Sequence, residues 1–193
     1  KRAGKQRERG DLEDSVGRPL KSWGPAVEPA ESLDATMASE MVFTMGLPAA
    51  GKSTTVAARY ATTHNIIDPD MIKESHPDYN PKAPEALHEW SSECAEQMFA
   101  AAIAAGAGCF VVDGTGTNAE KMARRIKRAR AAGFSVRLLY VRCTIETSLR
   151  RNALRARTVP EFVIREKARD IATSFEIVAG YVGMDAVEVA NND

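Results

Sequence analysis

The chain has 193 residues, of which 44% are hydrophobic and 27% charged, and this composition predicts a folded globular protein with at least one full core. Its 26 basic and 26 acidic residues cancel, so the overall charge gives no argument for a nucleic-acid or membrane partner. We find no run of the roughly 18 apolar residues that a membrane span needs, and no charged-then-apolar leader. We therefore expect no membrane segment, and the separated cysteines described below favour a reducing, cytoplasmic compartment.

Residues 1–40 differ in composition from the remainder, because they are charged, rich in Gly, Pro and Ser, and without sustained apolar periodicity. We predict an extended arm or linker with little core. A solvated tail is the simplest interpretation, and docking on a protein partner or a polyanion is the alternative. The sequence begins at Lys1 rather than at a methionine, so we expect a fragment or a processed form.

From residue 41 onward, short apolar runs alternate with longer segments of helical periodicity. The runs that predict strands are residues 41–45, 65–68, 109–113, 134–142 and 186–190. The apolar stripes that predict helix faces turned to the core are Leu87, Trp90, Cys94 and Met98; Met122, Ile126 and Ala129; and Ile164, Ala168, Ile171, Phe175 and Val178. This alternation predicts a mainly parallel five-stranded sheet with helices on both faces.

Three cysteines, Cys94, Cys109 and Cys143, lie far apart in apolar segments. Their odd number and wide spacing favour buried reduced thiols over a disulfide framework or a metal site.

The most specific motif is "GLPAAGKST", residues 46–54, between the first predicted strand and the first predicted helix. It matches Gly-x-x-x-x-Gly-Lys-Ser, whose backbone N–H groups surround phosphate oxygens, whose lysine neutralises the β- and γ-phosphates, and whose serine can ligate Mg²⁺. The motif predicts an ATP or GTP site with Mg²⁺ in a P-loop NTPase-type three-layer α/β sandwich over residues 41–193. The residues assigned to nucleotide binding are Gly46, Ala49, Ala50, Gly51, Lys52, Ser53 and Thr54.

Three aspartates follow predicted strands and should meet at the carboxyl edge of the sheet, where ligands bind in such folds. Asp68 and Asp70 end the second strand, and Asp113 ends the third in "CFVVDGTGTN". One carboxylate could accept a proton from an attacking hydroxyl while another holds Mg²⁺, and we assign the metal to Ser53 and Asp113. For Asp113 alone, a role as a turn former is an equal alternative.

The segments "GLPAAGKST", "IIDPDMIKESHPDY", "VVDGTGTN" and "ARTVP" together resemble the zeta-toxin kinases, P-loop phosphotransferases related to polynucleotide and chloramphenicol kinases. The resemblance covers residues 41–193. It implies that Asp70 activates the acceptor hydroxyl while Asp68 supports the turn. The residues expected on the acceptor side are Asp68, His76, Asp113, Thr115 and Thr117, although His76, which precedes Pro77, is expected mainly to shape its loop.

Residues 143–167 carry several arginines. Thr144 is a plausible N-cap, and Ile145, Leu149 and Ala153 are expected to face inward. Positive groups at the crevice edge would offset charge on the transferring phosphoryl group. The resemblance implies that one such group is Arg151, or its neighbour Arg150, and that a second is Arg157; a solvated basic face is the alternative.

These observations predict a kinase that moves the γ-phosphoryl group of ATP or GTP to a hydroxyl of a small nucleotide-like acceptor. Where sugar-nucleotide kinases commonly have Glu-Gly-Thr-Gly-Arg, this chain has Asp-Gly-Thr-Gly-Thr at residues 113–117, which argues against a UDP-sugar acceptor. The alternatives are a polynucleotide 5′-hydroxyl kinase, given the six basic residues of the predicted helix 118–132, and a nucleotide-binding interaction module without catalysis. An antitoxin-like partner could act through residues 1–40.

Overall fold

The computed structural model of the protein describes residues 38–155 and 158–193. Within these ranges, five parallel strands form one sheet in the order β2-β3-β1-β4-β5. The strands are β1 (Glu40–Met45), β2 (Asn65–Ile67), β3 (Cys109–Val112), β4 (Ser135–Arg142) and β5 (Val187–Asn191). Each predicted strand is confirmed, and the sheet is wholly parallel. Of the predicted arm at residues 1–40, only residues 38–40 are described. The predicted catalytic Arg157 lies outside the described residues.

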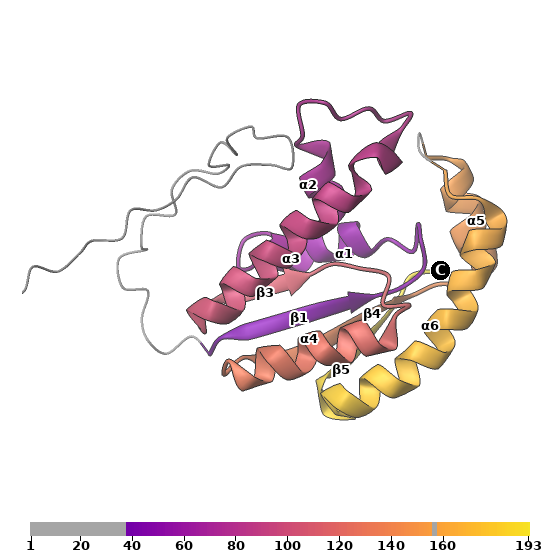
Figure 1. Cartoon of the computed structure of the whole chain (residues 1–193). Coiled ribbons are helices and arrows are strands. Elements are labelled where there is room, and N and C mark those ends of the chain that lie inside the picture. Colours follow the sequence, from indigo (N-terminus) through magenta and orange to yellow (C-terminus); the bar gives the residue numbers. More distant parts are fainter. Residues whose placement is uncertain (1–37, 156–157) are drawn as a thin grey trace, which may run out of the picture. The chain divides into compact units, whose positions relative to one another are not determined.

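The helices complete a three-layer sandwich. They are α1 (Lys52–Tyr60), α2 (Pro69–Glu74), α3 (His88–Ala105), α4 (Ala119–Ala131), α5 (Ile145–Ala153) and α6 (Glu161–Val182), with short 3₁₀ segments η1 (Pro84–Leu87) and η2 (Met184–Ala186). The chain moves one way along the sheet from β1 to β2 and the other way afterwards, so right-handed crossovers place α1 on one face and α3, α4 and α6 on the other (Figure 1).

The core forms on both faces of the central strands, as expected for a parallel sheet covered by helices. In β1, Met41, Val42, Phe43 and Met45 are fully buried, so both sides of the strand are covered. Phe43 meets Phe99 of α3 edge to face, with ring centroids 6.3 Å apart. The predicted stripes of α4 and α6 are confirmed, because their members are buried or packed against the core.

The predicted core face of α3 is wrong. The residues of α3 that are buried are Ser91, Ala95, Phe99 and Ala102, whereas Met98 is 43% exposed. Small side chains let the helix approach the sheet closely, and a single large ring, Phe99, fills the remaining space. Trp90 instead lies on a neighbouring side of the helix, against the ring of His76.

The predicted inner face of α5 is confirmed only for Ile145, which packs against the core, and the fully buried residues of the helix are polar. Thr147, Ser148 and Asn152 are buried, whereas Ala153 is exposed. Asn152 exchanges two hydrogen bonds with the backbone of Val159, at 2.8 and 2.9 Å. The buried polar side chains of α5 therefore bond backbone carbonyl and amide groups of neighbouring segments. Its predicted N-cap is confirmed, since the Thr144 hydroxyl accepts a hydrogen bond from the Thr147 N–H.

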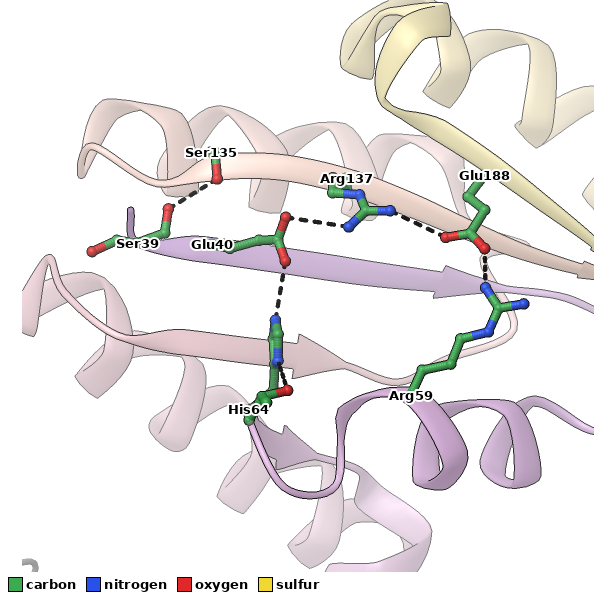
Figure 2. Close-up of polar contacts among 8 residues, drawn as sticks. Ser39, Glu40, Arg59, His64, Ser135, Arg137 and Glu188 are labelled. Atoms are coloured by element: carbon green, nitrogen blue, oxygen red, sulfur yellow. Dashed lines mark hydrogen bonds and ion pairs between the residues drawn. The ribbon is translucent and has the colours of Figure 1, made fainter. Parts of the chain in front are cut away.

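A chain of ion pairs crosses the sheet beside α1 (Figure 2). Glu40 of β1 accepts from His64, at 3.1 Å, and pairs with Arg137 of β4, at 3.6 Å. Arg137 also pairs with Glu188 of β5, at 3.1 Å, and Glu188 contacts Arg59 in the last turn of α1. Partly exposed pairs of this kind each contribute little, but the network joins α1 to three strands.

The structure also bears on the predictions for the cysteines and for a membrane segment. All three cysteines are free thiols, as predicted, but each is half-buried rather than fully buried. In the part of the chain that the structure describes, no helix is long and apolar enough to span a bilayer.

Candidate active site

The P-loop connects β1 to α1 at the carboxyl edge of the sheet. The ammonium of Lys52 donates to the carbonyl oxygens of Gly46 and Leu47, both at 3.0 Å, and so lies across the loop. Burial lowers the pKa of Lys52, and the carboxylate of Asp113 partly offsets this effect. Ser53 and Thr54 begin α1 with exposed side chains. This loop is shaped to take phosphate groups at the N-terminus of a helix.

Asp113 follows β3 and lies beside the P-loop lysine. Its carboxylate accepts a 2.6 Å hydrogen bond from the hydroxyl of Thr44, a buried residue of β1. The same hydroxyl accepts the Gly114 N–H at 2.9 Å, which fixes the turn after the strand. Burial raises the pKa of Asp113, and the Lys52 ammonium and the Thr44 bond act in the opposite direction. A carboxylate that is held and partly dehydrated in this way is suited to a cation.

Asp68 is buried and caps α2. Its carboxylate accepts the Asp70 N–H at 2.8 Å, which is the turn-supporting role predicted for it. Burial, followed by the nearby Asp113 carboxylate, raises the pKa of Asp68 to about 6. Asp68 therefore binds its proton more tightly than an ordinary aspartate, while its oxygen is committed to the backbone of the turn.

Asp70 lies in the first turn of α2, and 64% of its side chain is exposed. The ammonium of Lys73 donates to Asp70 at 3.2 Å, although the Lys73 side chain itself is only 2% exposed. A buried lysine in a short helix is uncommon, and here its stem packs inward while its charge reaches the Asp70 carboxylate. Sequence reasoning missed Lys73, because a lysine three residues after an aspartate is ordinary on a helix surface.

The loop after β3 packs against the P-loop. The Thr115 carbonyl accepts the Gly46 N–H at 3.1 Å, and the hydroxyls of Thr115 and Thr117 lie 3.2 Å apart. The hydroxyl of Ser174 in α6 holds the Gly116 carbonyl at 2.6 Å. The two threonines predicted on the acceptor side are thus brought next to the phosphate cradle.

His76 lies just beyond the C-terminal end of α2. Its Nδ1 accepts the Asp78 N–H at 3.1 Å, and its ring meets that of Trp90 with centroids 4.5 Å apart. These contacts join the loop to α3. They agree with the prediction that His76 mainly shapes its loop.

Of the described arginines that follow β4, Arg150 and Arg151 contact other groups of the protein, and Arg155 acts electrostatically on Lys52. Arg151 donates to the Asn192 carbonyl at 2.7 Å, and Arg150 lies 3.4 Å from the Thr147 hydroxyl. Arg155 lies close enough to Lys52 for its charge to contribute to lowering the lysine's pKa. The sequence indicated the basic segment, and the structure adds that, of the described arginines, Arg155 is one whose charge acts on Lys52.

Comparison with known proteins identifies the family of the chain. A family model described as an AAA domain matches residues 41–177, which is more than half of the chain. The chain belongs to this AAA domain family. The match contains the P-loop, the three aspartates and the arginine segment, and with the shared fold below it confirms the predicted resemblance to zeta-toxin-like P-loop kinases.

Solved structures share the fold of this AAA domain at low identity. The structure of the PezAT chromosomal toxin-antitoxin system of Streptococcus pneumoniae matches with a TM-score of 0.65 and 14% identity, over 81% of this chain and 70% of that chain. The AvrRxo1-ORF1:AvrRxo1-ORF2 complex with sulphate ions matches with a TM-score of 0.66 and 18% identity, over 80% and 55%. The Pnkp1/Rnl/Hen1 RNA repair complex matches with a TM-score of 0.58 and 14% identity, over 76% and 48%.

The AAA domain thus has a P-loop kinase-like fold, although it spans only about half the length of the second and third of these chains. A further structure of AvrRxo1-ORF1:-ORF2 contains ATP and shares the fold with a TM-score of 0.65 and 17% identity. No curated protein matches the chain.

The residues predicted to hold Mg²⁺ in the AAA domain fit a magnesium ion. Mg²⁺ takes one or two protein oxygens together with phosphate oxygens and water, so a site with few protein ligands is expected. The hydroxyl of Ser53 is exposed at the start of α1, and the partly buried Asp113 carboxylate would gain from a nearby cation. Among the described residues, no three His, Cys, Asp or Glu side chains gather into a metal site.

Proposed function

We propose that the protein is a P-loop kinase that transfers the γ-phosphoryl group of ATP or GTP to a hydroxyl of a small nucleotide-like acceptor. The observation that carries this proposal is the meeting of a phosphate-binding loop with carboxylates from two neighbouring strand ends. Asp113 acts on Lys52 electrostatically, and Asp68 is influenced by both Asp113 and Asp70. A nucleotide-binding module without catalysis has no use for carboxylates on the attack side.

Each residue has a distinct role in the proposed reaction. Lys52 and the loop N–H groups bind the β- and γ-phosphates, while Ser53 and Asp113 would hold Mg²⁺, which offsets phosphate charge when bound. Asp70 accepts the proton of the acceptor hydroxyl as the oxygen attacks the γ-phosphorus and the bond to the β-phosphate oxygen breaks. Lys73 orients Asp70 through its 3.2 Å contact.

Positive charge at the transferring group would come from Lys52 and from the arginine segment. Arg155 is supported by its electrostatic influence on Lys52. Arg157, which lies outside the described residues, keeps the role implied by the family resemblance. Arg151 is assigned no direct contact with phosphate, because its guanidinium donates to the Asn192 carbonyl.

We do not extend the proposal to a polynucleotide acceptor held by α4. Most of the basic residues of α4 contact the protein itself. Arg125 pairs with Glu96, Arg128 lies over the Phe99 ring with its guanidinium carbon 4.9 Å from the centroid, and Arg130 donates to the Val182 carbonyl at 2.7 Å. These three side chains are engaged in packing α4 against α3 and the C-terminal end of α6, although all the basic residues of α4 except Arg125 remain exposed.

The proposal is tested by incubating the purified protein with Mg²⁺ and γ-labelled ATP or GTP in the presence of candidate acceptors. The panel comprises nucleotide sugars, NAD, nucleosides and 5′-hydroxyl oligonucleotides. We expect label to move to one member of the first three classes. Transfer only to the oligonucleotides would replace the small acceptor with a polynucleotide, and nucleotide binding without any transfer would favour the interaction module.

A further inference from the structure

The backbone carbonyls of the P-loop are held by side chains from outside the loop. Besides the two carbonyls bound by Lys52, the Pro48 carbonyl accepts the hydroxyl of Ser148 in α5 at 2.7 Å. The Ala50 carbonyl accepts the side-chain amide of Asn192, just after β5, at 2.7 Å. Ser148 and Asn192 lie 100 and 142 residues from the carbonyls that they bind, so distant parts of the chain converge on one loop.

These two contacts determine where the neighbouring N–H groups point. In a trans peptide the carbonyl and the N–H lie on opposite sides, so a carbonyl held outward turns the next N–H inward. The contacts at Pro48 and Ala50 therefore orient the N–H groups of Ala49 and Gly51. The Ala50 N–H is already used within the loop, since it donates to the Leu47 carbonyl at 3.2 Å.

Ala49, between the two held carbonyls, has a strained backbone. Its φ of 57° makes it the one non-glycine residue with positive φ in the described ranges. A side chain disfavours this conformation, so it persists only where the surroundings impose it. Alternation of left-handed and right-handed residues is what turns successive N–H groups toward an anion.

Asn192 is itself fixed in place. Its N–H donates to the Arg142 carbonyl at 2.8 Å, and its carbonyl accepts the Arg151 guanidinium at 2.7 Å. A Cβ added to Gly51 would lie 2.3 Å from the Asn192 amide nitrogen, so the side chain fills the space beside the loop. The amide therefore has a defined position from which to hold the Ala50 carbonyl.

We infer that Ser148 and Asn192 are positioning residues of the phosphate cradle, which fix the two peptides whose N–H groups bind the nucleotide phosphates. Arg151 belongs to this arrangement, because it holds Asn192. The inference also explains why α5 buries the hydroxyl of Ser148, which is a donor to the loop. It rests on the proposed function, since it takes the P-loop to be a phosphate site.

The test measures binding of MgADP by calorimetry to the wild-type chain and to Asn192→Asp. The variant keeps the shape of the side chain but places a carboxylate oxygen against the Ala50 carbonyl. We expect the Kd to rise roughly tenfold, which is about 1.4 kcal/mol, with little change in the thermal midpoint. Asn191→Asp adds the same charge on an exposed neighbour and should leave the Kd within about twofold.

A second pair of variants needs no added charge. Ser148→Ala removes the donor to Pro48 and should raise the Kd roughly threefold. Ser91→Ala, which removes an equally buried helix hydroxyl bonded only within α3, should have no such effect. If the wild type binds MgADP and neither Asn192→Asp nor Ser148→Ala weakens binding, the inference is wrong while the proposed function stands. If the wild type does not bind MgADP, both fall.

Discussion

Asp68 offers a test of the electrostatics of the site that does not depend on catalysis. The substitution Asp68→Asn removes a charge that burial and Asp113 disfavour, but it keeps a side-chain oxygen that can accept the Asp70 N–H. Asparagine and aspartate are about equally good N-caps, so α2 should begin as before. We therefore predict that the variant is more stable than the wild type near neutral pH.

The magnitude follows from the pKa. A rise from 3.8 to about 6 corresponds to a free energy of about 3 kcal/mol at most. Because a protein relaxes around a buried charge, we expect about half of this, ~1.5 kcal/mol. The folded chain binds this proton more tightly than the unfolded chain does. The stability contributed by Asp68 is therefore complete below about pH 4 and is lost as the pH rises through about 6.

The assay is urea unfolding of wild type and Asp68→Asn between pH 4 and 7.5, without Mg²⁺ or nucleotide. The difference in the free energy of unfolding should be close to zero at pH 4 and should grow to ~1.5 kcal/mol in favour of the variant at pH 7.5. Asp68→Ala, which loses both the charge and the cap, serves as the control. A difference that does not change with pH, or a variant less stable at pH 7.5, would refute the reasoning.

Three other substitutions test the fold around the site, each by urea unfolding. Phe99→Ala should lower the free energy of unfolding by about 3–5 kcal/mol because the ring is fully buried, and a loss below about 1 kcal/mol would contradict its role in the core. Asn118→Ala should lower the free energy of unfolding by about 1 kcal/mol, since the Asn118 side chain caps α4 by accepting the Lys121 N–H at 2.8 Å. An unchanged urea midpoint would show that the cap is not needed. Gly46→Ala should lower the free energy of unfolding by more than about 2 kcal/mol, because the new Cβ would lie 2.4 Å from the Val141 carbonyl oxygen. A variant as stable as the wild type would disprove that close approach.

The sheet and the P-loop were predictable from the sequence for clear physical reasons. Short apolar runs marked all five strands, both β1, which is buried on both faces, and the partly exposed edge strands β2 and β5. The Gly-x-x-x-x-Gly-Lys-Ser pattern allows few other structures between a strand and a helix. The three aspartates could be placed by topology alone, because parallel strands end at one edge of the sheet.

The helix faces were harder to predict, because periodicity assigns large apolar residues to the core. In α3 the close approach to the sheet selects Ala95 and Ala102 instead, and Met98 is left exposed. In α5 the partners are backbone groups, the Pro48 carbonyl of the P-loop for Ser148 and the backbone of Val159 for Asn152, so these polar residues are buried. Nothing in the local sequence reveals a partner that is distant along the chain.

Contacts between distant side chains were likewise outside the reach of local patterns. Thr44 lies in an apolar strand and reads as an ordinary β-branched residue, yet its hydroxyl holds Asp113, 69 residues away. Asn192 follows the last strand without any motif, and its bond to Ala50 depends on the order of the strands. The sequence contains Thr44 and Asn192, but which groups they bind follows only from the tertiary structure.

The central claim is that this site transfers a phosphoryl group with Asp70 as the base. The most direct measurement compares wild type with Asp70→Asn for the rate of label transfer from γ-labelled ATP to the identified acceptor, and for nucleotide affinity. Asp185→Asn, an exposed aspartate at the amino end of β5, is the matched control. We predict that Asp70→Asn lowers kcat by about 10²–10⁴ with the nucleotide Kd within about threefold, and that the control transfers normally. Comparable turnover by Asp70→Asn would contradict the account.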